Sequence, residues 1–381
     1  MMKAFKNASI YVQDKGIIKT DLLFDDKIIN IGGEIGNAEI IDLPDDAIVL
    51  PGFIDQHIHG ASGSDAMDGE ESALYNIAVS IAKEGVTSFL ATTMTEKKEK
   101  IINALTAIGE YIEKNHTDGA RVLGAHLEGP FIATKFCGAQ DPKYIVKPNI
   151  ESFSEFYKAS KGNIRMVTLA PEEDSDNLIK ELVSLGVTAS AGHTNAKHTE
   201  IVNALENGLN CITHTYNVQS PLHHREIGVV GSALLLDDLY SECICDGVHI
   251  SIPAIKLLLK NKPSDKFVVI SDAMRAKNLP EGESELGGQK VIVKNGEARL
   301  ENGALAGSVL NINKAIENLV KLCDVEFTKA VDFATINPAS NLGIADKYGS
   351  IKVGKVADFA VMDKNYSIIL TVRDGKVIYK A

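Results

Sequence analysis

Cysteine is scarce in this chain, and the cysteines do not have the spacing of a disulfide framework. The five cysteines are an odd number among 381 residues, at positions 137, 211, 243, 245 and 323. A disulfide scaffold needs cysteines that can pair, and a four-cysteine zinc site needs a second close pair. The Cys243-x-Cys245 pair stands alone inside an apolar segment. We therefore expect packed, reduced thiols and a reducing compartment.

Long apolar runs are also missing, and positive charge is in short supply. No run approaches the roughly 20 residues that a membrane-spanning helix needs, and no apolar stretch of signal-peptide length follows residues 1–6. Lysine and arginine total 39 against 51 acidic residues, for a net charge of −12. This balance argues against nucleic acid or an anionic membrane as a partner. It does not exclude a small anionic substrate, which responds to the local field of a pocket. We expect a cytoplasmic protein.

The middle of the chain alternates between strand and helix patterns around a sizeable core, with 45% hydrophobic residues. Apolar strand-like segments end near residues 59, 93, 128, 171, 193, 217, 249 and 272. Helix patterns lie between them, for instance at 71–83, 98–113, 177–185, 199–206 and 253–260. This series predicts an α/β protein with a (β/α)₈ TIM-type barrel rather than a doubly wound sheet. A β-rich excursion at 287–305 predicts a hairpin beside the site.

Both ends of the chain are rich in β patterns instead. Short apolar segments separated by Gly and Asp turns fill residues 1 to 50, and similar segments fill 354–379 with a hairpin turn at 373–376. We expect the two termini to meet in one small β-sandwich domain, residues 1–50 with 346–381. The catalytic barrel would then comprise residues 51–345.

Polar side chains follow the apolar strands, at the end of a barrel where active sites lie. His57 and His59 alternate along an extended strand and so point the same way. Glu128, His193 and His214 end three further strands. Any one of them alone would more often be a satisfied core residue. Because imidazole and carboxylate are the usual ligands of catalytic zinc or iron, their joint placement predicts one or two divalent metal ions per subunit.

Asp272 stands at the end of the last predicted strand. A metal lowers the pKa of a bound water to about 7, and Asp272 is placed to take a proton from that water and return it to a leaving amine. The pattern thus predicts hydrolysis of an amide or a related bond. A second polar cluster at 217–225, with His249 nearby, predicts a cradle for phosphate or carboxylate.

Motifs from 51 to 339 carry a resemblance to a known family. They are PGFID (51–55), HIHG (57–60), HLEGPFI (126–132), GHT (192–194), HTYN (214–217), SPLHHRE (220–226), DGVH (246–249), SDAM (271–274), LAGS (305–308) and NPA (337–339). Together they resemble the N-acetylglucosamine-6-phosphate deacetylases of the amidohydrolase superfamily. Some members of that family lack the His-x-His pair and use one metal, whereas this chain keeps it, which leaves a two-metal site open.

The resemblance implies conversion of N-acetylglucosamine 6-phosphate and water to glucosamine 6-phosphate and acetate by a homodimer. It implies Glu128, His193 and His214 as metal ligands and Asp272 as the general base. It also implies that Arg225 completes the neighbouring subunit's site. The substrate-binding residues would be Gln140, Asn217, Val218, Arg225, His249 and Leu305.

Two positions depart from the family pattern. Gln140 stands where members carry a histidine that contacts substrate, and Gln219 stands where methionine is common. A glutamine amide donates hydrogen bonds but never carries a positive charge. These departures keep a deacetylase of the galactosamine epimer, N-acetylgalactosamine 6-phosphate, as the main alternative.

Two further alternatives have less support. Cyclic-amide hydrolases of the dihydropyrimidinase kind bridge two metals with a carboxylated lysine on the fourth strand, and the corresponding segment here, 164–171, has no lysine. A non-catalytic sugar-phosphate sensor would have lost a metal ligand or the general base. Every expected one is present.

Overall fold

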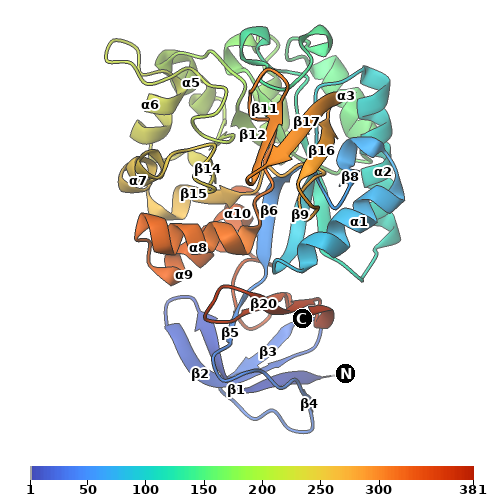
Figure 1. The fold of residues 1–381 in the computed structure, drawn as a ribbon, viewed down its shortest axis with the longest axis vertical. Helices are drawn as coiled ribbons and strands as arrows, with labels where there is room; N and C mark the ends of the chain where they lie inside the picture. Colours follow the sequence, from blue (N-terminus) through green and yellow to red (C-terminus); the bar gives the residue numbers. More distant parts are fainter. Residues whose placement is uncertain (1) are drawn as a thin grey trace.

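The middle of the chain folds into a barrel of parallel strands in the computed structural model, which describes residues 2–381 (Figure 1). In hydrogen-bonded order the described strands of this sheet are β15 (Phe267–Ile270), β14 (Tyr240–Ile244), β13 (Cys211–Ile212), β12 (Thr188–Ala191), β11 (Ile164–Leu169), β10 (Arg121–Glu128), β9 (Val86–Thr93) and β6 (Phe53–Ile58). The first and last strands meet near their carboxyl ends, where the backbone N of Asp272, two residues past β15, donates to the backbone O of His57 in β6 at 2.9 Å. The predicted barrel is confirmed.

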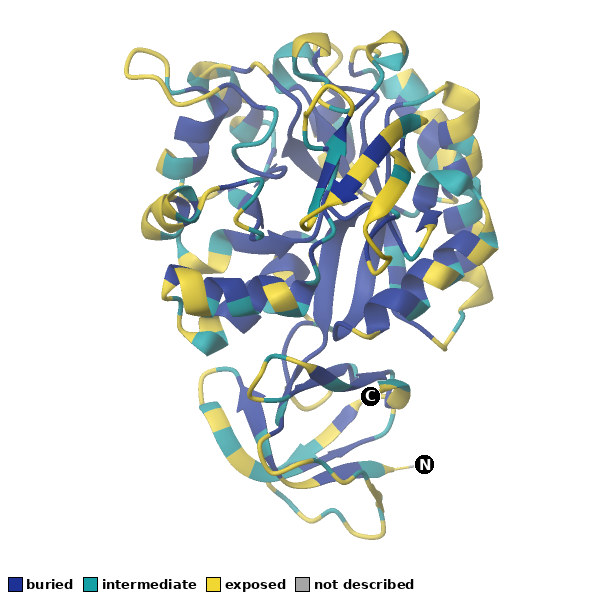
Figure 2. Cartoon of the chain, viewed as in Figure 1, coloured by how far each residue is buried: buried dark blue, intermediate teal, exposed yellow. Residues whose placement is uncertain are grey.

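Helices connect the strands and cover the outside of the barrel (Figure 1). They are α1 (Glu71–Ala82), α2 (Lys98–Lys114), α3 (Ile150–Ala159), α4 (Leu178–Ser184), α5 (His198–Glu206), α6 (Gly228–Leu235), α7 (Ile252–Asn261), α8 (Ile312–Cys323), α9 (Phe327–Asp332) and α10 (Ile336–Asn341). In α2 the buried residues Ile101, Leu105 and Ile108 recur every three or four positions, so one apolar face packs on the sheet. The helices are accordingly buried on one side, while the barrel strands are mostly buried, and β6 and β9 are buried at every position (Figure 2).

Three strands end before the polar residues that the sequence pattern placed at their ends. β12, β13 and β15 stop at Ala191, Ile212 and Ile270. His193, His214 and Asp272 follow with φ angles of +48°, +28° and +49°. This left-handed backbone is unfavourable for residues other than glycine and clusters at functional sites. It ends each strand and turns the following side chain in a new direction.

Strands from both termini form the small β domain below the barrel (Figure 1). They are β1 (Lys3–Val12), β2 (Gly16–Phe24), β3 (Ile28–Ile31), β4 (Glu39–Ile40), β5 (Ile48–Pro51), β19 (Phe359–Met362), β20 (Ile368–Arg373) and β21 (Lys376–Lys380). Two strands, β5 and β1, separate Phe359 from Phe24 in the sheet, yet the two ring centroids are 5.0 Å apart. A flat sheet would place them about 14 Å apart, so the sheet curls around its own core as a sandwich.

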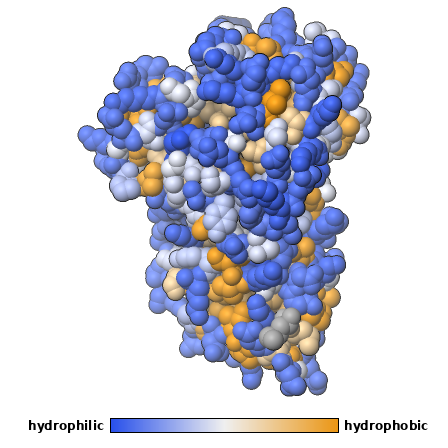
Figure 3. Space-filling model, turned by 90° about the vertical axis from the view of Figure 1, so that its right-hand side faces the viewer, coloured by the Kyte–Doolittle hydropathy of each residue, from blue (hydrophilic) through white to orange (hydrophobic). Residues whose placement is uncertain are grey.

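Exposed apolar side chains gather on the β domain, in the lower part of the view in Figure 3. Ile17, Ile29, Ile40 and Val377 are among the exposed apolar residues of this domain. The division into residues 1–50 with 346–381 and residues 51–345 stays a prediction, and residue 1 lies outside the described residues. The hairpin turn predicted at 373–376 joins β20 to β21, as expected.

Two small antiparallel sheets stand beside the strand ends of the barrel. One consists of β7 (Gly60–Ala61) and β8 (Ser64–Asp65). The other consists of β16 (Gly282–Leu286), β17 (Gln289–Lys294) and β18 (Glu297–Leu300). The second sheet begins before residue 287, so the predicted hairpin gains a strand. Its first turn uses Gly287 and Gly288, both at positive φ, as tight hairpin turns require.

Two expectations drawn from composition can be compared with the fold. Among residues 2–381, no helix combines the length and hydropathy needed to cross a bilayer. The cysteines of the same residues are unbonded, and Cys211, Cys243, Cys245 and Cys323 are buried. Packing of Cys243 and Cys245 as free thiols is thus confirmed. The cytoplasmic location stays a prediction.

Candidate metal centre and substrate pocket

Four histidines turn their Nε2 atoms toward the carboxylate of Glu128 at the carboxyl end of the barrel. The distances from Nε2 to the Glu128 oxygens are 3.4 Å for His57, 3.3 Å for His59, 3.3 Å for His193 and 3.1 Å for His214. All these side chains are buried. They form two groups that share Glu128, one with His57 and His59 and one with His193 and His214, and the ligand atoms within each group lie within 4.8 Å of one another.

The opposite nitrogens of three of these rings face hydrogen-bond acceptors. Nδ1 lies 3.1 Å from Glu242 Oε2 in His57, 3.2 Å from Thr92 O in His59 and 2.9 Å from Phe136 O in His193. A carbonyl or carboxylate oxygen only accepts, so in the neutral rings Nδ1 carries the proton and the Nε2 lone pair faces the centre.

The chain's own groups leave this centre short of hydrogen-bond partners. Among the described residues, the buried His57 Nε2 has no hydrogen-bond partner. The Nε2 atoms of His193 and His214 face each other at 3.1 Å, a separation at which two lone pairs repel unless a proton or cation lies near them. Convergent imidazole nitrogens around a carboxylate are the donor set of a divalent metal site. The residues present therefore fit the metal that the sequence predicts.

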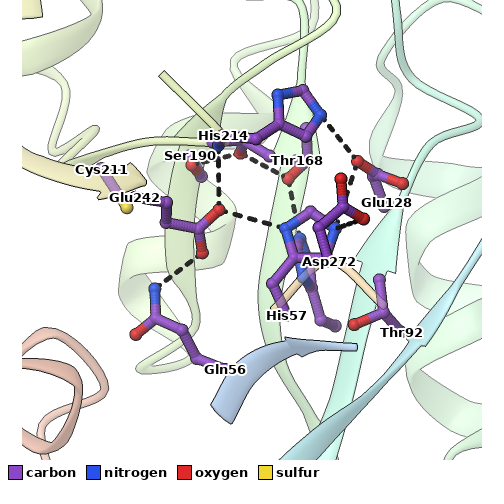
Figure 4. A network of polar contacts seen from close by, with 12 residues as sticks. Gln56, His57, Thr92, Glu128, Thr168, Ser190, Cys211, His214, Glu242 and Asp272 are labelled. Atoms are coloured by element: carbon purple, nitrogen blue, oxygen red, sulfur yellow. Dashed lines mark hydrogen bonds and ion pairs between the residues drawn. The ribbon is translucent and has the colours of Figure 1, made fainter. Parts of the chain in front are cut away.

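Asp272 faces the His57 ring (Figure 4) and also lies beside the His59 ring. Its Oδ1 lies 3.5 Å from His57 Nε2 and 3.3 Å from His59 Nε2. Burial raises the pKa of the Asp272 carboxyl, but the two neighbouring rings lower it more, to about 2. Burial likewise raises the pKa of Glu128, and the surrounding imidazoles hold it well below its usual value. Both shifts favour the ionised form of the carboxyls.

A buried link between the first and last strands fixes Asp272 relative to His57. Asp55 is fully buried in β6, and its Oδ2 accepts a hydrogen bond from Ser271 Oγ at 2.5 Å. Ser271 directly precedes Asp272, and the backbone of Asp272 bonds to that of His57 as described above. Sequence reasoning missed this link.

A cavity of ≈ 250 Å³ opens onto the metal centre. Of the predicted residues, it is lined by His59, Glu128, Gln140, His193, His214, Asn217, Val218, His249, Asp272 and Leu305. Sequence reasoning missed the remaining lining residues, which are Met94, Gly138, Ala139, Leu286, Ala304 and Gly307. These are apolar residues or glycines, so no polar side chain marks them as part of a site. Neither lysine nor arginine is among the described residues that line the cavity.

Arg225 does not lie in the cavity of its own subunit. Residues 221–226 are all exposed, and their loop projects from the barrel beside α6, at the upper left of Figure 1. The Arg225 guanidinium contacts the adjacent His224 ring at 2.7 Å. Arg225 is not among the residues that line the cavity, and its contact with substrate stays a prediction.

Gln140 and His249 are held in the pocket wall by neighbouring groups. Gln140 Oε1 accepts from Thr95 N at 2.9 Å, and its Nε2 donates to Glu128 Oε2 at 3.1 Å. The amide thus supports a metal-ligand candidate as well as lining the pocket. Burial lowers the pKa of His249, but Asp246, with Oδ2 at 2.6 Å from Nδ1, raises it more, above its ordinary value. This favours a cationic imidazole at the pocket.

Comparison with known proteins assigns the chain to a family. The model of the Amidohydrolase family matches residues 48–378. The chain belongs to the amidohydrolase family.

This amidohydrolase is similar to several sugar-phosphate deacetylases. It is 41% identical over 342 residues to N-acetylglucosamine-6-phosphate deacetylase of Bacillus subtilis, covering 89% of this chain and 86% of the relative. It is 34% identical to N-acetylgalactosamine-6-phosphate deacetylase of Escherichia coli O157:H7, covering 85% and 86%. The solved N-acetylglucosamine-6-phosphate deacetylase of Thermotoga maritima superposes with a TM-score of 0.90 at 34% identity, covering 99% and 100%. The resemblance inferred from the motifs is confirmed.

Proposed function

We propose that this amidohydrolase hydrolyses the acetamido group of N-acetyl-D-glucosamine 6-phosphate to D-glucosamine 6-phosphate and acetate, a step of amino-sugar metabolism. One observation carries the proposal: four imidazole Nε2 atoms and Asp272 converge with Glu128 at the cavity of ≈ 250 Å³. The relative with the galactosamine substrate is less similar, at 34% against 41% identity. The epimer is therefore the second candidate.

Glu128, His193 and His214 would hold one divalent cation, and His57, His59 and Glu128 would hold a second. Zinc and iron suit these ligands. When bound, such a cation supplies a Lewis acid that polarises the amide carbonyl and brings the pKa of water to about 7. The acceptors on Nδ1 of His57, His59 and His193 keep these three rings in the tautomer that this role requires.

Asp272 is the general base in this proposal. Its ionised carboxylate takes one proton from the attacking water while oxygen bonds to the acetyl carbon. The same carboxyl then gives this proton to the amine nitrogen as the carbon–nitrogen bond breaks. Acetic acid and a neutral amine result, and Asp272 returns to its starting state. At neutral pH the acid then loses its remaining proton and the amine gains one, so the released products are acetate and the ammonium form of glucosamine 6-phosphate. The link from Asp55 to Ser271 holds the carboxylate beside the His57 and His59 rings during both transfers.

The remaining pocket residues orient the sugar phosphate. Asn217, Val218 and Leu305 line the cavity with Gln140, and His249 offers a cationic donor. A phosphate dianion also calls for a bidentate donor, which arginine supplies best. Arg225 projects outward on an exposed loop and is free to reach a second copy. In this proposal the protein is a homodimer in which each Arg225 completes the neighbour's site.

The choice of epimer is tested by acetate release. With metal-loaded protein we expect kcat/KM for N-acetylglucosamine 6-phosphate to exceed that for its galactosamine epimer by about tenfold or more, since one mismatched hydroxyl contact leaves polar groups unpaired. A preference for the epimer would transfer the proposal to the second candidate. Release from neither sugar would refute the deacetylase function.

A further inference from the structure

Glu242 is a fully buried carboxylate that the proposed mechanism does not use. It lies on the largely buried strand β14, with a side-chain exposure of 0%. Among the described residues, its ion pairs are limited to His57, whose Nδ1 lies 3.1 Å from Oε2. A buried carboxylate costs several kcal/mol unless positive charge and hydrogen bonds compensate it. The compensating charge must therefore come through His57.

Glu242 contacts a member of each metal-ligand group. Besides the His57 ring, its Oε2 accepts a hydrogen bond from the backbone N of His214 at 3.1 Å. His214 is held there at a φ of +28°, a conformation that needs such support. In Figure 4 the His57 ring lies between Glu242 on one side and Glu128 with Asp272 on the other. One carboxylate oxygen thus orients a ring of one group and the backbone of the other.

The orientation of Glu242 is itself fixed by a chain of amides. Gln56 Nε2 donates to Glu242 Oε1 at 2.7 Å, and Asn341 Nδ2 donates to Gln56 Oε1 at 3.1 Å. The acceptors facing His59 and His193 are neutral backbone carbonyls. Three of the four rings have a described hydrogen-bond partner on Nδ1, and Glu242 is the charged one among these partners. A carboxylate on Nδ1 makes the opposite nitrogen a stronger metal ligand.

We infer that Glu242 is a positioning residue that orients and strengthens His57 as a ligand of the second metal ion. The inference rests on the metal centre of the proposed function. If His57 Nε2 binds a cation, the ring proton stays on Nδ1 and is donated to Glu242. The positive charge of the cation then balances the negative charge of the carboxylate across the neutral ring. Loss of this carboxylate should weaken the His57 and His59 group by roughly 10- to 100-fold in metal affinity, while the Glu128, His193 and His214 group keeps its ion.

The test measures metal binding and needs no substrate. Metal-free wild type, Glu242→Gln and Thr168→Val are titrated with zinc against a chelating indicator, and bound zinc is counted after gel filtration. Thr168 is a matched control because it is buried and its Oγ1 bonds to the ring of His126 at 2.7 Å, a histidine outside the two groups. We expect two zinc sites of unchanged affinity in wild type and Thr168→Val. In Glu242→Gln we expect one site to keep the wild-type affinity for zinc and the other to bind zinc more weakly.

Either of two results would overturn the inference: a single zinc site in wild type, or affinities in Glu242→Gln within about threefold of wild type at both sites. Because the inference predicts a 10- to 100-fold effect, the two outcomes are well separated. If Glu242→Gln fails to fold, the ¹⁵N NMR spectrum of the imidazole nitrogens in zinc-loaded wild type tests the inference instead. The His57 signals are assigned as those that disappear in His57→Asn. A proton on Nδ1 of His57 agrees with the inference, and an unprotonated Nδ1 contradicts it.

These measurements are independent of the proposed reaction. Zinc binding as expected without acetate release would refute the deacetylase function and leave the role of Glu242 intact. Acetate release with unchanged zinc binding in Glu242→Gln would do the reverse.

Discussion

Replacing Asp272 with asparagine should lower kcat by roughly 10²- to 10⁴-fold, the usual contribution of a general acid–base group. The amide keeps the shape of the carboxyl but has no site that accepts a proton at neutral pH. Because Asp272 lies outside both groups that could hold a metal, the metal content should stay at the wild-type value. Acetate release under saturating substrate and metal analysis of the same sample check both expectations.

A second aspartate provides the control for this variant. Asp332 is partly buried at the end of α9, where its Oδ1 accepts a hydrogen bond from the Tyr11 hydroxyl of the β domain at 2.9 Å. This position lies away from the strand ends that carry the metal centre. Asp332→Asn should therefore turn over substrate at nearly the wild-type rate. If Asp272→Asn matched that rate, Asp272 would not be the base.

Replacing Arg225 with alanine should lower kcat/KM for the phosphorylated sugar by roughly 10²- to 10³-fold, in line with the 2–5 kcal/mol typical of truncating one partner of a buried charge pair. The same substitution should leave the weak activity toward unphosphorylated N-acetylglucosamine unchanged, because that sugar offers no phosphate. Arg225 is exposed, so the fold should not suffer. An equal loss with both sugars would mean that Arg225 does not read the phosphate.

Mixed dimers test whether Arg225 acts on the neighbouring site. When Arg225→Ala subunits pair with Asp272→Asn subunits, the first keep their base and receive an intact arginine from the second. Each mixed dimer then has one working site, so mixing two nearly inactive proteins restores activity. If Arg225 served its own subunit, the mixture would stay as inactive as its components.

The barrel and the cluster of metal-ligand candidates could be predicted because strand ends in a parallel barrel share one face. His57, Glu128, His193 and Asp272 lie far apart in the chain, yet each lies at or just past the carboxyl end of a strand, so topology alone brings them together. The strand bounds were less predictable. The left-handed turns at His193, His214 and Asp272 occur at residues that give no glycine signal.

Contacts across the barrel interior could not be predicted from local pattern. His57 and Glu242 are 185 positions apart, and pairing them requires knowing which side chains of β6 and β14 face inward at the same level. The one available signal was a charged residue inside an apolar strand, which marks a buried carboxylate but not its partner. The outward direction of Arg225 was equally hidden, because loop sequences do not fix the path of the chain.

The most direct test of the central claim is acetate production from N-acetylglucosamine 6-phosphate in water enriched with ¹⁸O, followed by mass spectrometry. The account predicts that metal-loaded protein releases acetate and glucosamine 6-phosphate in equal amounts, with one solvent oxygen in each acetate. Release should stop when a chelator removes the metal and resume when zinc or iron is restored. Unchanged release from fully metal-free protein, or no acetate from the metal-loaded protein, would contradict the account.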